Sequence, residues 1–140
     1  MQNNPNTTLV TAIAPIATNT HGGRAKCLQR LVRLDMPVPQ TVALSFEAVD
    51  KIAKGQLPDI ARILEQFPED ALLCVRPSSE DPDWGGPSAI LNIGINQSRY
   101  AALRESLGDN AAAMLFTRFA QSYAVHVDRL DPDMIDDVTQ

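Results

Sequence analysis

Residues 77–88 consist of Pro, Ser, Gly, Asp and Glu apart from Trp84, the single tryptophan of the chain. These residue types interrupt helices and strands and favour turns and loops. One apolar run precedes the stretch at 71–75, and another follows it at 89–93. Short apolar runs that are bounded by turn residues are typical of buried strands. The pattern therefore predicts a strand, a long loop and a second strand, with Arg76 at the end of the first strand.

Short elements are also predicted along the rest of the chain. Ser45 is a suitable helix cap, and Gly55 is a suitable helix stop. Because strands and helices alternate first and helices dominate later, the predicted class is α/β or α+β, a small sheet with flanking helices and a helical C-terminal part. The expected elements are strands at 8–13, 41–44, 71–75 and 89–93, a loop at 18–23, and helices from 24 to before 37, 45–54, 58 to 66 or 67, 98–107, 110 to about 128, and a short one from 131.

Length, charge and hydropathy narrow the class of protein. At 140 residues we expect one domain, with a flexible N-terminus over 1–18 that holds the first strand. The hydrophobic fraction of 44% is sufficient for a core, and the net charge of -5 argues against nucleic acid or an anionic membrane as a partner. No apolar stretch approaches the roughly 20 residues of a membrane span. The first residues lack the features of a signal peptide, so we expect a cytoplasmic protein.

Both cysteines, Cys27 and Cys74, lie inside apolar patterns. We expect both thiols to be buried, reduced and slow to react. A disulfide or a metal site is the alternative, and the spacing of the two residues gives it no support.

Gly22 and Gly23 directly precede the helix that is expected from Arg24. Glycine allows a ligand to approach the backbone closely. The start of a helix offers free N–H groups and the positive end of the helix dipole, and a guanidinium adds donors that suit phosphate. These three residues are therefore a candidate anion site. The alternative is a simple turn followed by a solvated arginine.

Arg76 is the second candidate for a functional cation. It could hold the 77–88 loop through backbone carbonyls, or it could bind phosphate, and its chemistry favours neither role.

Trp84 could fill a core or offer a stacking surface to a base. His21 and His126 belong to no partner motif, and His126 is expected on a helix, either packed or exposed. The pattern assigns no catalytic residue and no metal ligand.

Three stretches, in the right order, resemble the N-terminal part of the nucleotide-binding domain of pyruvate phosphate dikinase and its relative phosphoenolpyruvate synthase. HGGRAKCLQRLVRLDMPVPQTVALSFEAV resembles the Gly-Gly-Lys helix of the family and the G-[LM]-P-[VI]-P-x-G-F segment after it. VRPSSEDPDWGGPSAILNIGIN aligns without a gap on the dikinase stretch that runs Val-Arg-Ser-Gly, Pro-Gly-Met-Met-Asp-Thr and Ile-Leu-Asn-Leu-Gly-Leu-Asn, which favours the dikinase over the synthase. FTRFAQSYAVHVDRLDPDMIDDV resembles the dikinase helix RRFIQMYxxVV and the acidic segment after it.

The resemblance implies the first lobe of an ATP-grasp fold, in which two lobes clamp the nucleotide. Residues 19–140 would then be part of the ATP-binding domain, with the second lobe absent. ATP is the implied ligand, Mg²⁺ is implied only together with the second lobe, and catalysis would need the remaining dikinase domains in cis or in trans. The implied phosphate-binding residues are Gly22, Gly23, Arg24, Arg76, Gly85, Gly86 and Ser88.

The sequence departs from the family at several informative positions. Arg24 replaces the lysine, which keeps the charge and changes the geometry. Glu80 replaces the second arginine of the family, and this reversed charge would repel phosphate. Other family residues are replaced by Thr41-Val42, Pro77 and Ser88-Ala89.

Three functions remain open at this point. The first is the ATP-binding portion of a dikinase-like phosphotransferase that needs other domains for chemistry. The second is a diverged binding or regulatory module without kinase activity, which Glu80 favours. The third is a truncated gene product.

Overall fold

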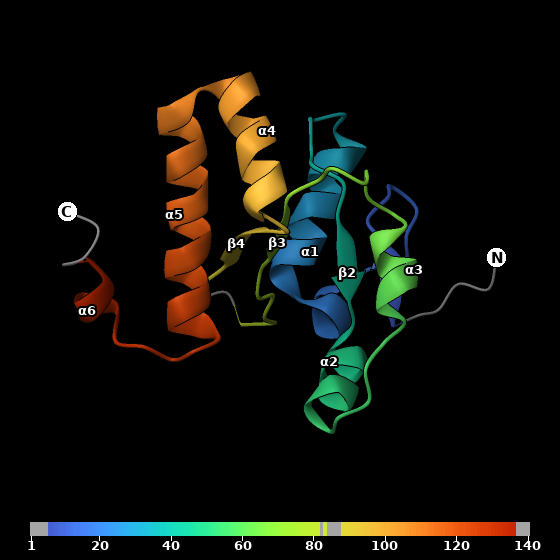
Figure 1. Ribbon diagram of the computed structural model, residues 1–140. Helices are drawn as coiled ribbons and strands as arrows, with labels where there is room; N and C mark the ends of the chain where they lie inside the picture. Colours follow the sequence, from blue (N-terminus) through green and yellow to red (C-terminus); the bar gives the residue numbers. More distant parts are fainter. Residues whose placement is uncertain (1–5, 82, 84–87, 137–140) are drawn as a thin grey trace. The chain divides into compact units, whose positions relative to one another are not determined.

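The computed structural model describes residues 6–81, 83 and 88–136, and it divides the chain into two compact units (Figure 1). Unit 1 consists of Met1–Glu69 and Ser78–Gly85, and unit 2 consists of Asp70–Pro77 and Gly86–Gln140. The described residues form six helices and two small antiparallel sheets, so the chain is a mixed α and β protein of the α+β kind. None of the described helices is long and apolar enough to cross a membrane.

The sheet of unit 1 pairs β1 (Thr7–Leu9) with β2 (Val42–Leu44) in antiparallel register, with Thr8 opposite Ala43. The strand predicted at 41–44 is therefore confirmed. The strand predicted at 8–13 begins one residue earlier and is much shorter. After Val10, whose N–H donates to the carbonyl of Thr41 at 2.9 Å, the chain leaves the sheet in a turn.

Helix α1 (Thr18–Arg33) includes residues that the sequence pattern assigns to a loop. The N–H of His21 donates to the carbonyl of Ala17 at 2.9 Å, and the hydroxyl of Thr20 donates to the same carbonyl at 3.1 Å. Gly22 then interrupts the helix with φ of 83° and ψ of 166°. The loop prediction for 18–23 is wrong because local hydrogen bonds to Ala17 close a helical turn before this kink.

The core of unit 1 forms between α1 and the sheet. Its buried members are Val10, Ile16, Ala25 and Ala43. Gln29 is also fully buried, and its Nε2 donates to the carbonyls of Ala14 at 2.7 Å and Thr11 at 3.0 Å. Its Oε1 accepts from Lys26 Nζ at 2.9 Å, and this nitrogen also donates to the carbonyl of Ile16 at 2.9 Å. Side chains of α1 therefore hold the segment that connects β1 to α1.

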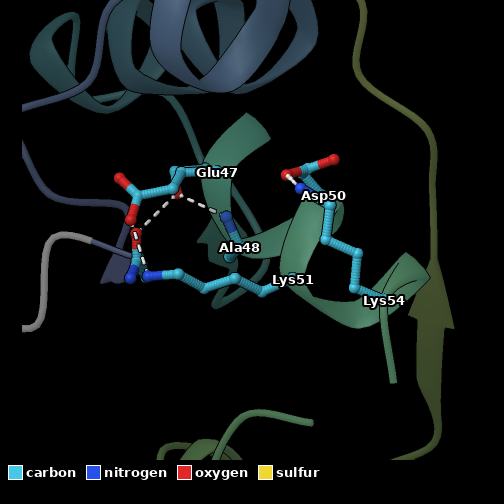
Figure 2. Close-up of polar contacts among 7 residues, drawn as sticks. Glu47, Ala48, Asp50, Lys51 and Lys54 are labelled. Atoms are coloured by element: carbon cyan, nitrogen blue, oxygen red, sulfur yellow. Dashed lines mark hydrogen bonds and ion pairs between the residues drawn. The ribbon is translucent and has the colours of Figure 1, made fainter. Parts of the chain in front are cut away.

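Helix α2 (Phe46–Ala53) begins and ends where the sequence predicts. The hydroxyl of Ser45 accepts from the N–H of Ala48 at 3.1 Å, and Gly55 follows the helix with φ of 84°. Figure 2 shows the exposed ion pairs of this helix, in which Lys51 contacts Glu47 and Lys54 contacts Asp50, each at 2.6 Å. Both pairs are four residues apart, a spacing that stabilises exposed helices by small amounts.

Helix α3 (Ile60–Leu64) completes the regular structure of unit 1. The side chain of Asp59 caps it by accepting from the N–H of Arg62 at 3.1 Å. The helix predicted from residue 58 is confirmed, although it starts two residues later and gives way to turns after Leu64.

Unit 2 begins with β3 (Leu73–Val75), which pairs in antiparallel fashion with β4 (Ile90–Ile93). Leu73 lies opposite Ile93 and Val75 opposite Ile90, with an irregularity between the two pairs. The two strands predicted at 71–75 and 89–93 are therefore confirmed in shorter form, whereas much of the loop predicted between them lies outside the described residues.

The helices of unit 2 are α4 (Gln97–Leu107), α5 (Asp109–His126) and α6 (Pro132–Asp136). All three are predicted from the sequence, and α5 ends two residues before the expected position. Helix α5 packs against β4 and α4, as Figure 1 shows. The hydroxyl of Ser122 accepts from the N–H of Leu91 at 3.1 Å, and the rings of Tyr100 and Phe116 meet edge to face at 5.7 Å.

Both cysteines are exposed, so the expectation that they are buried is wrong. Cys27 lies two residues from both Ala25 and Gln29, which is about 200° around a helix. It therefore faces away from the buried side of α1. Cys74 lies in β3, an edge strand of a two-stranded sheet, and Val75 beside it is also exposed. The apolar run resembles a buried strand, but a sheet of two strands does not cover it on both faces.

Candidate functional site

The helical segment that begins at Gly23 meets residues 78–79 inside unit 1. The N–H of Gly23 donates to the carbonyl of Ser79 at 2.7 Å. The N–H of Ala25 donates to the hydroxyl of Ser78 at 3.3 Å. Serine is a preferred capping residue because its hydroxyl accepts from the N–H groups of a first helical turn. Here the capping serine comes from a distant part of the chain, and we call these two hydrogen bonds the serine latch.

Gly22 is the residue that allows this contact. A Cβ atom at position 22 would lie 2.3 Å from the Ser78 hydroxyl oxygen and 2.6 Å from the Ser78 carbonyl carbon. The backbone of Gly22 also has φ of 83° with ψ of 166°, a combination that essentially only glycine adopts. The close approach expected at this glycine is therefore made by the chain's own residues 78–79.

The latch changes what the helix start offers to an anion. Free N–H groups are expected there, but those of Gly23 and Ala25 already have acceptors. That part of the expectation is wrong for these two groups, because residues 78–79 supply the oxygen atoms that a phosphate would supply. Arg24 lies between them in sequence, and its side chain is exposed.

The remaining predicted site residues belong to unit 2 or lie outside the described residues. Arg76 is exposed and directly follows β3. Because Val75 pairs with Ile90, Arg76 and Ser88 lie at the same end of the β3–β4 sheet. Gly85 and Gly86 lie outside the described residues, as does Trp84. Arg24 belongs to unit 1 and Arg76 to unit 2, and their joint action on one ligand stays a prediction.

Both arginine side chains are without polar partners among the described residues. In the residues that the structure describes, neither the Arg24 nor the Arg76 guanidinium makes a hydrogen bond or an ion pair. Arg76 therefore does not hold the described part of the 77–88 loop through backbone carbonyls. Glu80, which departs from the family pattern, is exposed in unit 1.

His21 is a buried titratable residue that the sequence pattern does not single out. Its residue exposure is 4%, and its Nδ1 lies 2.8 Å from the hydroxyl oxygen of Thr20. Its Nε2 is buried and has no hydrogen-bond partner among the described residues. Burial lowers the pKa of the His21 imidazole below its ordinary value of 6.5, because the charged form loses solvation.

A hollow of about 320 Å³ lies beside His21 in unit 1. The first turn of α2 forms one side of it. The lining residues are Pro15, Asn19, Thr20, His21, Ser45, Phe46 and Glu47. Across the described ranges 6–81, 83 and 88–136, no cluster of three or more His, Cys, Asp or Glu side chains could hold a metal ion.

Sequence reasoning missed Ser78 and Ser79, and it considered His21 only as a lone histidine without a role. Two adjacent glycines indicate that something approaches closely, but they do not indicate which segment does so. The serine pair in a polar loop is a suitable source of caps, and that is the only signal of the latch in the sequence. The burial of His21 follows from the helical turn before Gly22, which the pattern assigns to a loop.

In comparisons with known proteins, no family model matches this chain and no curated protein matches it. The resemblance to the dikinase family therefore rests on the three motifs and on their order.

Proposed function

We propose that the chain is the ATP-binding portion of a pyruvate phosphate dikinase-like phosphotransferase, equivalent to the first lobe of an ATP-grasp-like domain. It contributes phosphate contacts and is not catalytically complete alone. One observation carries the proposal. The Gly22–Gly23 helix start and the segment that follows Arg76 are distant in sequence, resemble two phosphate-binding motifs of one family, and are joined by hydrogen bonds within unit 1.

The free guanidinium groups support this proposal. A planar guanidinium presents paired donors that match phosphate oxygens. Arg24 and Arg76 are both exposed and have no described partner that competes with a ligand. The role of Arg76 as a tie for its loop has no hydrogen bond to support it in the described residues, which leaves its guanidinium available for the proposed phosphate contact.

The expected affinity is weak. A dissociation constant near 0.1–1 mM corresponds to about 4–5.5 kcal/mol. Charged hydrogen bonds of roughly 1.5–3 kcal/mol each supply this amount from two arginines. Phosphoryl transfer also requires Mg²⁺ and a positioned acceptor. Following the family resemblance, we propose that other dikinase domains supply both, in this chain or in another.

A second candidate function is a diverged binding or regulatory module that no longer binds nucleotide tightly. The serine latch favours it, because the N–H groups of Gly23 and Ala25 are already satisfied. The exposed carboxylate of Glu80, one residue beyond Ser79, would also oppose a polyphosphate.

Titration with ATP by calorimetry or phosphorus NMR distinguishes the two. The variants are Arg24→Ala, Arg76→Ala and Glu80→Arg, and Arg30→Ala is the matched control because it removes an exposed arginine from the same helix. The proposal requires weak, salt-sensitive binding that both candidate arginines support, that Glu80→Arg tightens and that Arg30→Ala leaves unchanged. If neither the wild type nor any variant binds ATP, or if all of them bind it equally, the second function is favoured. Release of AMP from ATP and pyruvate by the purified chain would refute catalytic incompleteness.

A further inference from the structure

His21 has no part in the proposed phosphate site, yet its environment is unusual. The residue is only 4% exposed. The Thr20 hydroxyl is within hydrogen-bond distance of Nδ1, whereas the buried Nε2 has no partner among the described residues. A buried polar atom without a partner is energetically unfavourable, and such atoms are rare in folded proteins. The neutral ring leaves one nitrogen unsatisfied.

The position of His21 connects it to the serine latch. It directly precedes Gly22, whose backbone packs against Ser78 and Ser79 without room for a Cβ atom. A contact this close leaves little tolerance for movement of the backbone. The helical turn that contains His21 therefore has to keep its place if Gly23 and Ala25 are to keep their acceptors.

Protonation changes the hydrogen bonding and the charge of the His21 side chain. Both nitrogens of an imidazolium are donors, so Nε2–H would then require an acceptor, and the described residues supply none. A buried charge without a counterion is also strongly disfavoured. The neighbouring hollow of about 320 Å³ gives the ring a route toward solvent, and Glu47 lines that hollow.

No charged group in the described surroundings stabilises the imidazolium in its buried place. Strand β2 and the segment at 11–17 carry no ionisable side chain. On α2, Glu47 lines the hollow, and its carboxylate is already bonded to Lys51 at 2.6 Å. The other charged residues of the elements around His21 are Arg24, Lys26, Arg30 and Arg33 of α1, Asp50 of α2 with Lys54 at the C-terminal end of that helix, and Glu80 and Asp81 beyond the latch.

We propose that His21 is a pH-sensitive switch that controls the serine latch. Neutral His21 keeps the turn at 18–21 packed and the latch closed. Protonated His21 leaves its buried place, which displaces Gly22 and releases residues 78–79 from the helix start. This inference does not depend on nucleotide binding.

The direction of the pH dependence follows from linkage. Burial lowers the pKa of His21 in the closed form below the ordinary value of 6.5 that applies to the open form. Between those two values the open form binds a proton and the closed form does not. The latch is therefore closed above about pH 6.5, and each pH unit below it, down to the lowered pKa, raises the open-to-closed ratio about tenfold.

Amide hydrogen exchange measured by NMR tests the proposal. The protection factors of the Gly23 and Ala25 amides are followed from pH 7.5 to pH 5, together with the ring signals of His21. The Val10 amide, which donates to Thr41 in the same unit, reports on unfolding of unit 1 as a whole. The variants are His21→Asn, which cannot titrate, and His126→Asn as the matched control that removes the other histidine.

We expect protection of Gly23 and Ala25 to fall at low pH in the wild type and in His126→Asn, by up to about tenfold for each pH unit between about 6.5 and the lowered pKa, with Val10 unchanged. The fall should follow the titration of the His21 ring, a comparison that needs no variant. Constant protection of Gly23 and Ala25 across this range would overturn the proposal. An equal fall in His21→Asn, or a matching fall at Val10, would do the same.

Discussion

Replacement of Gly22 by alanine tests the structural basis of the serine latch. The new Cβ would lie 2.3 Å from the Ser78 hydroxyl oxygen and 2.8 Å from the Ser79 nitrogen, so the segment at 78–79 must move. The backbone at φ of 83° and ψ of 166° costs a residue with a Cβ about 1–3 kcal/mol. The two latch hydrogen bonds contribute about 1 kcal/mol each. We therefore expect Gly22→Ala to destabilise unit 1 by about 3–5 kcal/mol.

Two other glycines separate the causes of this loss. At Gly23 a Cβ would make only an ordinary contact, 3.5 Å from the Ser79 carbonyl oxygen, and alanine favours the helix by up to about 1 kcal/mol. Gly23→Ala should therefore be neutral or stabilising. Gly55 has φ of 84° with no described atom within 4 Å of the added Cβ. Gly55→Ala should therefore show backbone strain alone, about 1–2 kcal/mol.

Urea unfolding followed by NMR signals of unit 1 measures all three variants, because signals of single residues keep the two units separate. Amide exchange at Gly23 in the same samples reports directly on the latch. If Gly22→Ala is as stable as Gly23→Ala and the Gly23 amide stays protected, residues 78–79 do not pack on Gly22 as described, and the reasoning fails.

Three further outcomes are expected. Cys27 and Cys74 are both exposed, so a thiol reagent should label both rapidly under native conditions, and slow labelling of either would contradict its exposure. Gln29→Leu removes the donor that satisfies the carbonyls of Thr11 and Ala14. Urea unfolding should therefore show that the free energy of unfolding falls by about 2–3 kcal/mol. An unchanged free energy would mean that water replaces the side chain as donor. Ser45→Ala removes the cap of α2 and should cost about 1 kcal/mol in the same assay, whereas Ser106→Ala, near the end of α4, should cost less.

The elements that the sequence predicts well are those with local signals. Ser45 supplies a cap for the helix directly after it, and Gly55 adopts the positive φ that ends the same helix. The loop of Pro, Gly and acidic residues separates β3 from β4 in a similar way. Such signals act over a few residues, so the identity and order of the elements can be predicted without knowledge of their tertiary contacts.

The features that the sequence does not predict depend on distant partners. The acceptor of the Ala25 N–H comes from Ser78, which lies 53 residues further along the chain. The exposure of Cys74 depends on the size of the sheet, which an apolar run does not indicate. The candidate anion site was predicted from glycine, helix start and arginine, and no part of that pattern indicates that the chain itself supplies the oxygen atoms.

The division into units has a consequence for synthesis. Unit 1 needs residues 78–85, and unit 2 needs residues 70–77, so the chain passes from one unit to the other and back. A ribosome that has finished all the helices of unit 1 has not yet made Ser78. Until residues 78–79 emerge, the N–H groups of Gly23 and Ala25 lack their native acceptors, and all of β3 must leave the ribosome before the latch can close. For the same reason, a fragment cut after residue 69 would keep every helix of unit 1 and lose the latch.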